Sequence, residues 1–266
     1  MWDNRAAVAA VLLDDVVRHL DQILEVAKFR DYGPNGLQVE GRREVARVVT
    51  GVSANLALIQ AAAERKADLI VVHHGLIWGG GIERVVGATA RRLGALLGAG
   101  MSLAAYHLPL DKHPGLGNNA GLADALGLPA DRQTFGAIRG HELGVLADLP
   151  EPLPRAELLA RVCAGVLGGG EPAFVFPHGP DPVRRVGLCT GAASDLLEEA
   201  AARGCDAYIT GELAERSGEL ARELGVTLVG AGHHATEVYG PSRLAHELRV
   251  RFPGLDAEFV DVPSPL

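Results

Sequence analysis

Two adjacent histidines, His73 and His74, end a short apolar run, Leu69–Val72, that is typical of a buried strand. Neighbouring side chains on a regular strand point to opposite faces, so both imidazoles can serve one site only where the strand ends and turns. Open α/β sheets bind their ligands at the carboxyl ends of parallel strands. Imidazole is a common ligand of transition metals. This pair is therefore the first candidate for a metal site.

A histidine followed four residues later by a carboxylate occurs twice, each time after another apolar run. The residues are His107 with Asp111 and His233 with Glu237, and His234 adjoins the second pair. On a helix, side chains at this spacing share one face. Each residue alone has an ordinary explanation as a hydrogen-bonded or solvated side chain.

Together, these imidazoles and carboxylates form a donor set without cysteine. Such a set is typical of a site for zinc, iron, manganese or nickel. It is not typical of a closed structural site, which usually has thiolate ligands. If the five best candidates shared two ions, open coordination positions would remain for water or substrate, as catalysis requires.

These side chains need strands that end at one edge of a sheet and helices that follow them. Apolar runs predict strands at about 45–52, 69–74 and 101–107. Periodicity and capping residues predict helices at 8–28, 87–99 and 118–126, and one from Ser53 or Asn55 to about 66. Later strand-like pieces lie around 143–147 and 174–176, and a helix is expected near 155–167.

The chain contains an internal repeat. Thr50–Ser53 opens the unit that ends at His73–His74, and Thr190–Ala193 opens a similar unit. With two residues deleted, Glu212 falls at the position of His74, and the segments leading to the two histidine–carboxylate pairs follow in the same order. Because two successive segments match in order, we interpret the chain as a duplication.

The duplication predicts an α/β fold of two similar lobes, with mixed sheets flanked by helices. We expect a first lobe at 1–128 and a second at 129–266, whose C-terminal part returns to a cleft shared by both lobes. The strand ends of both lobes would meet in that cleft, which is where we expect the metal site.

Composition excludes several classes of protein. The 266 residues carry a net charge of −8 without a basic cluster, so we expect no binding to duplex nucleic acid. No run of eighteen apolar residues occurs, so we expect no membrane span and predict a cytoplasmic protein. The three cysteines, Cys163, Cys189 and Cys205, lack a CxxC spacing and are interpreted as small buried hydrophobic residues in a reducing compartment.

Several motifs together resemble the dinuclear metal-centre family of YbgI and the NGG-interacting-factor-like proteins, often called GTP cyclohydrolase 1 type 2 homologues. The matching stretches span the chain: DYGPNGLQVEG (31–41), VVHHGLIW (71–78), HLPLDKHPGLGNNAGLA (107–123), TGE (210–212) and GHHATE (232–237). The resemblance implies two similar α/β lobes and a homo-hexamer.

The resemblance also implies a metal centre and a substrate class. It implies two divalent transition-metal ions per subunit, bound by His73, His74, Asp111, His233 and Glu237, with Asp111 bridging them. By the same resemblance, a metal-activated water would attack a small, nucleotide-like substrate such as GTP. No motif that reads the base is evident, and the polar candidates for it are Asn35, Gln38, Asn118 and Asn119.

Two further residues are interpreted from their own chemistry. We predict that His107 and Glu212 support the metal ligands or transfer protons, because a carboxylate near a metal-bound water is a usable base. Glu212 has an equally simple explanation as a carboxylate at a helix N-terminus.

The same ligands would also serve a protein that is not an enzyme. A metal carrier, a metallochaperone or a regulatory scaffold needs the same donor set, and the lack of an evident substrate motif favours it. Open coordination positions favour the hydrolase. A third interpretation is a metal-free α/β binding protein with incidental histidines.

Overall fold

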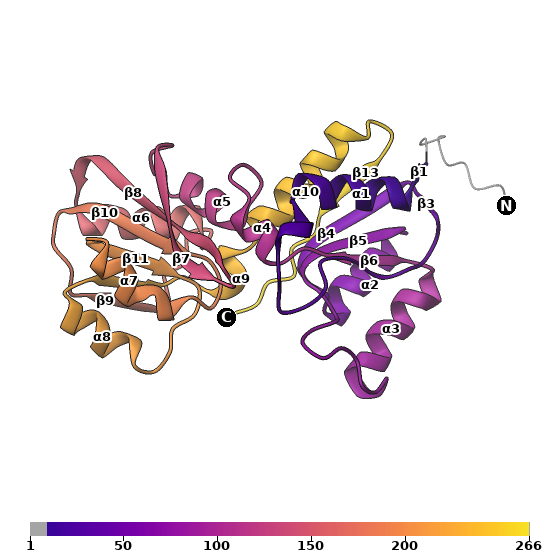
Figure 1. Ribbon diagram of the computed structural model, residues 1–266, viewed down its shortest axis with the longest axis horizontal. Coiled ribbons are helices and arrows are strands. Elements are labelled where there is room, and N and C mark those ends of the chain that lie inside the picture. Colours follow the sequence, from indigo (N-terminus) through magenta and orange to yellow (C-terminus); the bar gives the residue numbers. More distant parts are fainter. Residues whose placement is uncertain (1–9, 266) are drawn as a thin grey trace. The chain divides into compact units, whose positions relative to one another are not determined.

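The computed structural model describes residues 10–265, which form two compact units with a mixed sheet in each (Figure 1). The first unit comprises the described chain up to Leu110 and Gly240–Val262, and the second comprises Asp111–Tyr239 and the residues from Pro263 onward. The backbone therefore passes between the units at Leu110, at Tyr239 and at Val262. The predicted α/β architecture with mixed sheets is confirmed.

The first unit is built on a five-stranded sheet in the order β13-β4-β5-β6-β2. Its strands are β13 (Asp256–Phe259), β4 (Arg47–Ser53), β5 (Leu69–His74), β6 (Ser102–Ala105) and β2 (Gly36–Val39). The first four are parallel, and β2 runs antiparallel to β6. Because β5 lies inside the sheet with its first five residues buried, its sequence is a continuous apolar run rather than an alternating one.

Helices cover both faces of this sheet (Figure 1). One face carries α2 (Leu56–Glu64) and α3 (Gly87–Ala99), and the other carries α1 (Leu13–Ile23) and α10 (Tyr239–Arg251). The side chain of Asn55 caps α2 by accepting the backbone N–H of Leu58 at 2.8 Å, so Asn55 rather than Ser53 is the cap. The buried Leu58 and Ile59 of α2 pack in one core with Ile70 and Val72 of β5.

The single helix predicted for 8–28 is wrong. Within the described residues, a short strand, β1 (Val11–Leu12), pairs with β3 (Glu44–Val45) before α1 begins at Leu13. The helix ends at Ile23, and Glu25, with a φ of 52°, separates it from a 3-10 turn at Val26–Lys28. Pairing with β3 and this left-handed residue override the helical periodicity. Residues 8 and 9 of the prediction lie outside the described residues.

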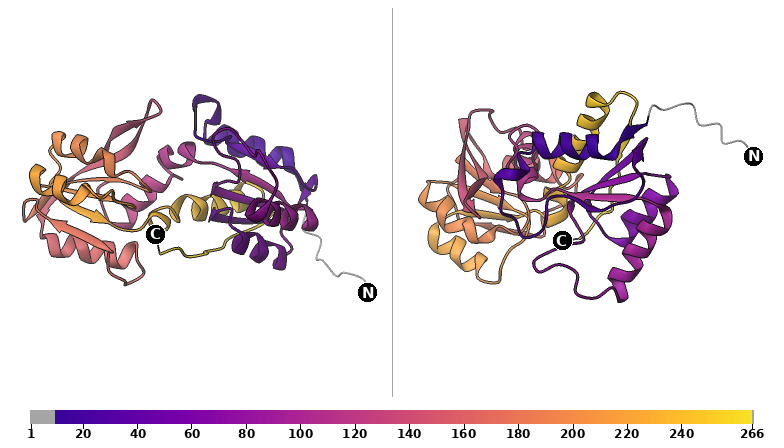
Figure 2. Two further views of the ribbon diagram at one scale, coloured as in Figure 1. Left: turned by 90° about the horizontal axis from the view of Figure 1, so that it is seen from below. Right: turned by 45° about the vertical axis from the view of Figure 1, so that its right-hand side comes forward.

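The second unit is built on a six-stranded sheet in the order β7-β8-β10-β11-β12-β9. Its strands are β7 (Arg132–Ile138), β8 (His141–Leu153), β10 (Val183–Cys189), β11 (Ala207–Thr210), β12 (Thr227–Gly230) and β9 (Phe174–Pro177). The central three are parallel, and β8 and β9 flank them antiparallel. Figure 2 shows helices on both faces of this sheet. These helices include α5 (Asn118–Ala125), α6 (Arg155–Gly165), α7 (Leu197–Ala202) and α8 (Ser217–Leu224). Two short helices, α4 (Leu108–Lys112) and α9 (His233–Thr236), carry predicted site residues.

The two sheets repeat one hydrogen-bonding pattern. The carboxylate of Asp68 accepts the backbone N–H groups of Ala46 and Arg47. The carboxylate of Asp206 accepts those of Arg184 and Arg185 in the same way. Each arginine in turn donates to a carbonyl at the end of the helix that leads to the aspartate. The matching residues are 138 positions apart (47 and 185, 68 and 206). The predicted similarity of the two halves is therefore present in their hydrogen bonds.

The constant separation of 138 positions corrects the sequence alignment of the two halves. That alignment matched the two Thr-Gly motifs to each other and therefore required a two-residue deletion. The pairing of β4 with β5 and of β10 with β11 follows the constant separation without any deletion. Glu212 still falls at the position of His74. The pairing of β6 and β12 with their neighbours places His233 one residue beyond the position of His107.

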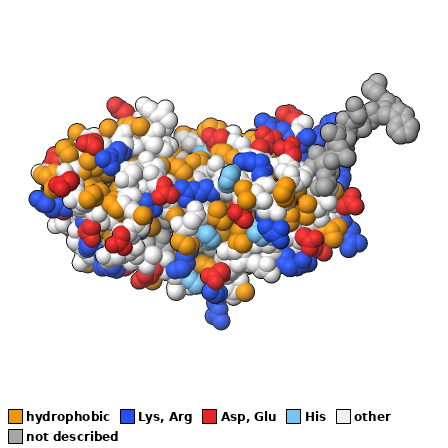
Figure 3. All heavy atoms as spheres, turned by 90° about the horizontal axis from the view of Figure 1, so that it is seen from above, with side chains coloured by type: hydrophobic (Ala, Val, Ile, Leu, Met, Phe, Trp, Pro, Cys, Tyr) orange, Lys and Arg blue, Asp and Glu red, His pale blue; other side chains and the backbone are white. Residues whose placement is uncertain are grey.

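The described surface has mixed charge. On the face shown in Figure 3, acidic and basic side chains are interspersed. Among residues 10–265, no helix combines the length and the apolar character that crossing a bilayer requires.

Candidate metal centre

Three imidazoles meet at the carboxyl ends of two strands of the first unit. His73 and His74 end β5, and His107 follows β6 after one intervening residue, Tyr106. One ring nitrogen from each lies within 4.8 Å of those of the other two. The ring of His73, which is fully buried, lies 4.5 Å from that of His74 and 5.0 Å from that of His107, between centroids. The prediction that adjacent histidines converge where their strand ends fits this arrangement.

The Nδ1 atom of each key imidazole bonds to the protein. In the first unit, His73 donates from Nδ1 to the carbonyl of Tyr106 at 2.9 Å, and His107 donates to the carboxylate of Asp31 at 2.7 Å. In the second unit, His233 donates to Glu212 at 2.6 Å. These partners can only accept, so Nδ1 carries the proton and Nε2 of a neutral ring keeps its lone pair. Metal-binding histidines are commonly held in this way, with the second ring nitrogen bonded to a carbonyl or carboxylate.

His74 has a comparable contact, since its Nδ1 lies 3.1 Å from Oγ of Ser53. A hydroxyl can donate or accept, so this contact fixes the orientation of the ring without fixing its tautomer. Ser53 ends β4 and is paired with His74 in the sheet. The sheet register itself therefore brings the hydroxyl to the imidazole.

Asp31 is a residue of the candidate site that the sequence interpretation missed. Its carboxylate, only 1% exposed, accepts four hydrogen bonds: from Nδ1 of His107, from the side chain of Asn35, and from the backbone N–H groups of Tyr32 and Leu108. Burial raises the pKa of Asp31, but the hydrogen bond and charge of His107, with the bonds from Asn35 and Tyr32, outweigh it and lower the pKa to about 2. Asp31 is thus held ionised and fixes the ring of His107.

The polar side chains considered for reading a base have internal partners. Asn35 donates to Asp31 and accepts the N–H of His107, and Gln38 accepts the N–H groups of Leu76 and Ile77. In the second unit, the amides of Asn118 and Asn119 donate to the side chain and the carbonyl of Asp111. Each amide thus holds a loop or a helix start within its own unit.

Acidic groups gather around His233 in the second unit. Nε2 of His233 lies 3.1 Å from Oε2 of Glu237, while its Nδ1 bonds to Glu212. Burial lowers the pKa of His233, but the hydrogen bonds and charges of Glu237 and Glu212 outweigh it and raise the pKa to about 9. The glycine at position 191 suits this place: its φ is +69°, and a Cβ would lie 2.3 Å from Oε1 of Glu237, so a larger residue would displace that carboxylate.

Asp111 and Glu237 are both buried, with exposures of 7% and 3%. Burial raises the pKa of the thiol of Cys189, and the charges of these two carboxylates raise it further. Buried carboxylates cost free energy unless hydrogen bonds or cations compensate them. Asn118 and Thr190 donate to Asp111, and a divalent cation is the further compensation that this donor set suits.

Glu212 is not at a helix N-terminus. It lies in the loop after β11, and the next helix, α8, begins at Ser217. The alternative of a dipole-stabilised carboxylate is therefore wrong, and its hydrogen bond to His233 is the contact that explains it. His234 lies beside His233 on α9 and is partly exposed.

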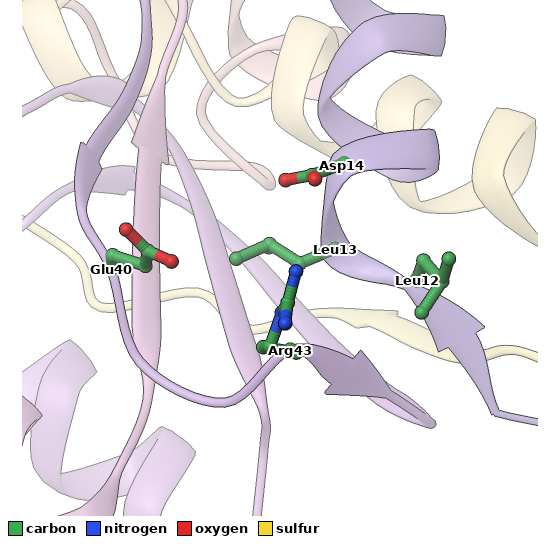
Figure 4. A pocket seen from close by; sticks show the side chains of 5 residues that line it. All are labelled: Leu12, Leu13, Asp14, Glu40 and Arg43. Carbon is green, nitrogen blue, oxygen red and sulfur yellow. The ribbon is translucent and has the colours of Figure 1, made fainter.

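A pocket in the first unit has no histidine in its lining. It is found where β1 meets α1, and Figure 4 shows the side chains that line it, namely Leu12, Leu13, Asp14, Glu40 and Arg43. This set includes no histidine or cysteine and none of the predicted site residues, so the pocket is not part of the candidate metal centre.

Comparison with known proteins covers almost the whole chain. The sequence model of the Duf34/NIF3 (NGG1p interacting factor 3) family matches residues 11–265. A protein of Pseudomonas aeruginosa, named "GTP cyclohydrolase 1 type 2 homolog", is 43% identical over 256 residues, which cover 96% of this chain and 99% of that protein.

Two solved structures are similar along their full lengths. The protein ybgI, described as of unknown function, has 39% identity and a TM-score of 0.88, covering 96% of this chain and 100% of its own. The protein TTHA1606 from Thermus thermophilus has 37% identity and a TM-score of 0.85, with the same coverage.

Proposed function

Because this chain belongs to the Duf34/NIF3 family, we propose that it is a metal-dependent hydrolase that acts on a nucleotide-like substrate. The observation that carries this proposal is that His73 and His233 both bond to protein acceptors through Nδ1, which directs Nε2 of each ring toward a metal. The name of the relatives, which contains GTP cyclohydrolase, supports the substrate class.

The proposed ligands are the five predicted from the family resemblance. They are His73 and His74 of the first unit and Asp111, His233 and Glu237 of the second. Bound divalent ions of zinc, iron, manganese or nickel would lower the pKa of a water molecule and stabilise negative charge on the substrate. We propose two ions per subunit, the number that the family resemblance implies. Five donors shared between two ions would leave each ion with open coordination positions.

The supporting residues have distinct roles. His107, with its Nδ1–H fixed on Asp31, can accept a proton at Nε2 and release it again, which is the property needed of a general base. Glu212 is a positioning residue, because it holds the Nδ1 proton of His233 and so directs Nε2 of that ring. Asp31 has the same positioning role for His107.

Metal content and turnover test the proposal together. We expect His73→Ala and Glu237→Gln each to lose about one metal equivalent per subunit by elemental analysis after dialysis, together with hydrolysis of a panel of nucleotides. His178→Ala is the matched control, because this histidine is exposed in the loop after β9, and it should keep both metal and turnover. Unchanged metal content in both site variants would refute the ligand assignment. Retained metal without turnover on any nucleotide in the wild type would refute the hydrolase and favour a metal carrier.

A further inference from the structure

Two exposed aromatic rings stand beside the imidazole cluster of the first unit. Tyr32 is 45% exposed and Trp78 is 37% exposed. The ring centroid of Trp78 lies 5.1 Å from that of His107 and 5.9 Å from that of His74, and Tyr32 lies 5.9 Å from His107. Aromatic residues make up only 5% of the chain, so the position of two exposed ones at the same imidazole needs an explanation.

The backbone holds both rings in place. The indole N–H of Trp78 donates to the carbonyl of Gly75 at 2.9 Å, and the N–H of Gly79 donates to the carbonyl of Tyr32 at 2.6 Å. The loop that follows Asp31 and the loop that follows β5 are thereby joined. Their contact is close, since a Cβ at Gly33 would lie 2.4 Å from the carbonyl oxygen of Ile77.

Fixed, exposed aromatic faces are suited to stacking. Every nucleobase has a π face, and stacking on an aromatic side chain does not depend on hydrogen bonds to the base. This property matches the first unit, because the amides of Asn35 and Gln38 are already engaged in holding its loops. The contacts of Tyr32 with His107 and of Trp78 with His74 and His107 are edge-on or tilted, and both aromatic residues keep exposed surface beside the imidazoles.

We propose that Tyr32 and Trp78 form the subsite that binds the planar heteroaromatic ring of the substrate. The ring would stack on these side chains, next to the Nε2 atoms of the imidazole cluster. This inference rests on the proposed function for the identity of the reaction. The stacking itself is a binding property that can be measured without turnover.

Trp78 can report on stacking directly. The chain has two tryptophans, Trp2 and Trp78, so Trp2→Phe leaves Trp78 as the single indole. In this background we expect guanosine monophosphate to change the tryptophan emission saturably. Ribose 5-phosphate, which has the sugar and phosphate without the ring, should leave the emission unchanged. Equal responses to the two probes, or none to either, would overturn the inference.

Substitutions then separate stacking from a structural role. We expect Trp78→Leu and Tyr32→Leu each to weaken binding of guanosine monophosphate by roughly 5- to 150-fold in equilibrium dialysis, the range that stacking on one base gives. Tyr32→Phe should bind as the wild type does. Phe174→Leu is the control, because Phe174 is 57% exposed on β9 of the second unit. Metal content should stay at the wild-type level in all four variants, whereas a merely structural role would lower it.

The outcomes also separate this inference from the proposed function. If the wild type hydrolyses a nucleotide and Trp78→Leu leaves its KM unchanged, the subsite is refuted and the hydrolase stands. If the wild type binds guanosine monophosphate through Trp78 but hydrolyses no nucleotide, the hydrolase is refuted and the subsite stands.

Discussion

The carboxylate of Asp31 should be one of the most stabilising charges in the first unit, and Asp31→Asn tests this. The pKa of the carboxyl is lowered from 3.8 to about 2, and that difference is equivalent to about 2 kcal/mol of stability at neutral pH. An amide retains the shape but has one acceptor in place of two. Its NH₂ group would face N–H donors that now bond to the second oxygen. We therefore expect a loss of about 2–3 kcal/mol in the free energy of unfolding.

Urea unfolding of chelator-treated protein measures this loss. In the Trp2→Phe background, the fluorescence of Trp78 follows the first unit, which contains Asp31. The control is Asp15→Asn, because Asp15 and its partner Arg18 are 45% and 61% exposed and such a pair contributes about 0–1 kcal/mol. If Asp31→Asn costs no more than Asp15→Asn, the four hydrogen bonds do not stabilise the fold as argued.

The effect has a defined pH dependence. A carboxyl whose pKa is lower in the folded state stabilises the protein fully above its unfolded pKa, near 4, and loses that contribution as the pH falls through about 2. The difference between wild type and Asp31→Asn should therefore be constant from pH 7 to about pH 5. About half of it should be lost by pH 3. A difference that grows on acidification would refute the assignment of the stabilisation to the ionised form.

Two other predictions follow from the hydrogen-bond pattern and from the glycine beside Glu237. Asp68→Ala and Asp206→Ala should each cost about 2 kcal/mol in urea unfolding, because each substitution removes the one oxygen that accepts two consecutive backbone N–H groups. Clearly unequal costs would argue against equivalent roles. Gly191→Ala should lower metal content by displacing Glu237, whereas Gly225→Ala, which has a similar φ of +66° and open space around its Cβ, should lose about 1 kcal/mol of stability with its metal content intact. Equal metal content in both glycine variants would show that the contact with Glu237 is not critical.

Much of the fold could be predicted because its signals are local. The run before His73 is apolar at every position because β5 is buried on both faces, and the predicted helix at 87–99 matches α3. The ends of such strands can be read from the sequence, and so can the ligand-type residues that follow them. The helix predicted for 8–28 failed because β1 pairs with β3, a contact between residues more than thirty positions apart.

The partners of the imidazoles could not be predicted for the same reason. Asp31 and His107 are 76 residues apart, and no local pattern indicates which polar residue of the DYGPNG motif reaches the ring. The presence of an aspartate just before the turn was the only available signal. The register of the repeat was also hidden, because the matching Thr-Gly motifs suggested a deletion that the strand pairing does not contain.

The two kinds of repeated contact have different origins. Asp68 and Asp206 occupy equivalent positions, so their shared pattern follows from the similarity of the two sheets, whatever the protein does. The carboxylates that hold His107 and His233 do not occupy equivalent positions. Asp31 lies before β2 in the first unit, whereas Glu212 follows β11 at the position of His74.

The histidines they hold also differ by one position in the register. Structural repetition cannot explain why each unit nevertheless places a carboxylate within 2.7 Å of an Nδ1 atom. A shared need to fix the orientation of both rings at a metal centre would explain it, and this is the strongest reason to propose that these histidines belong to such a centre.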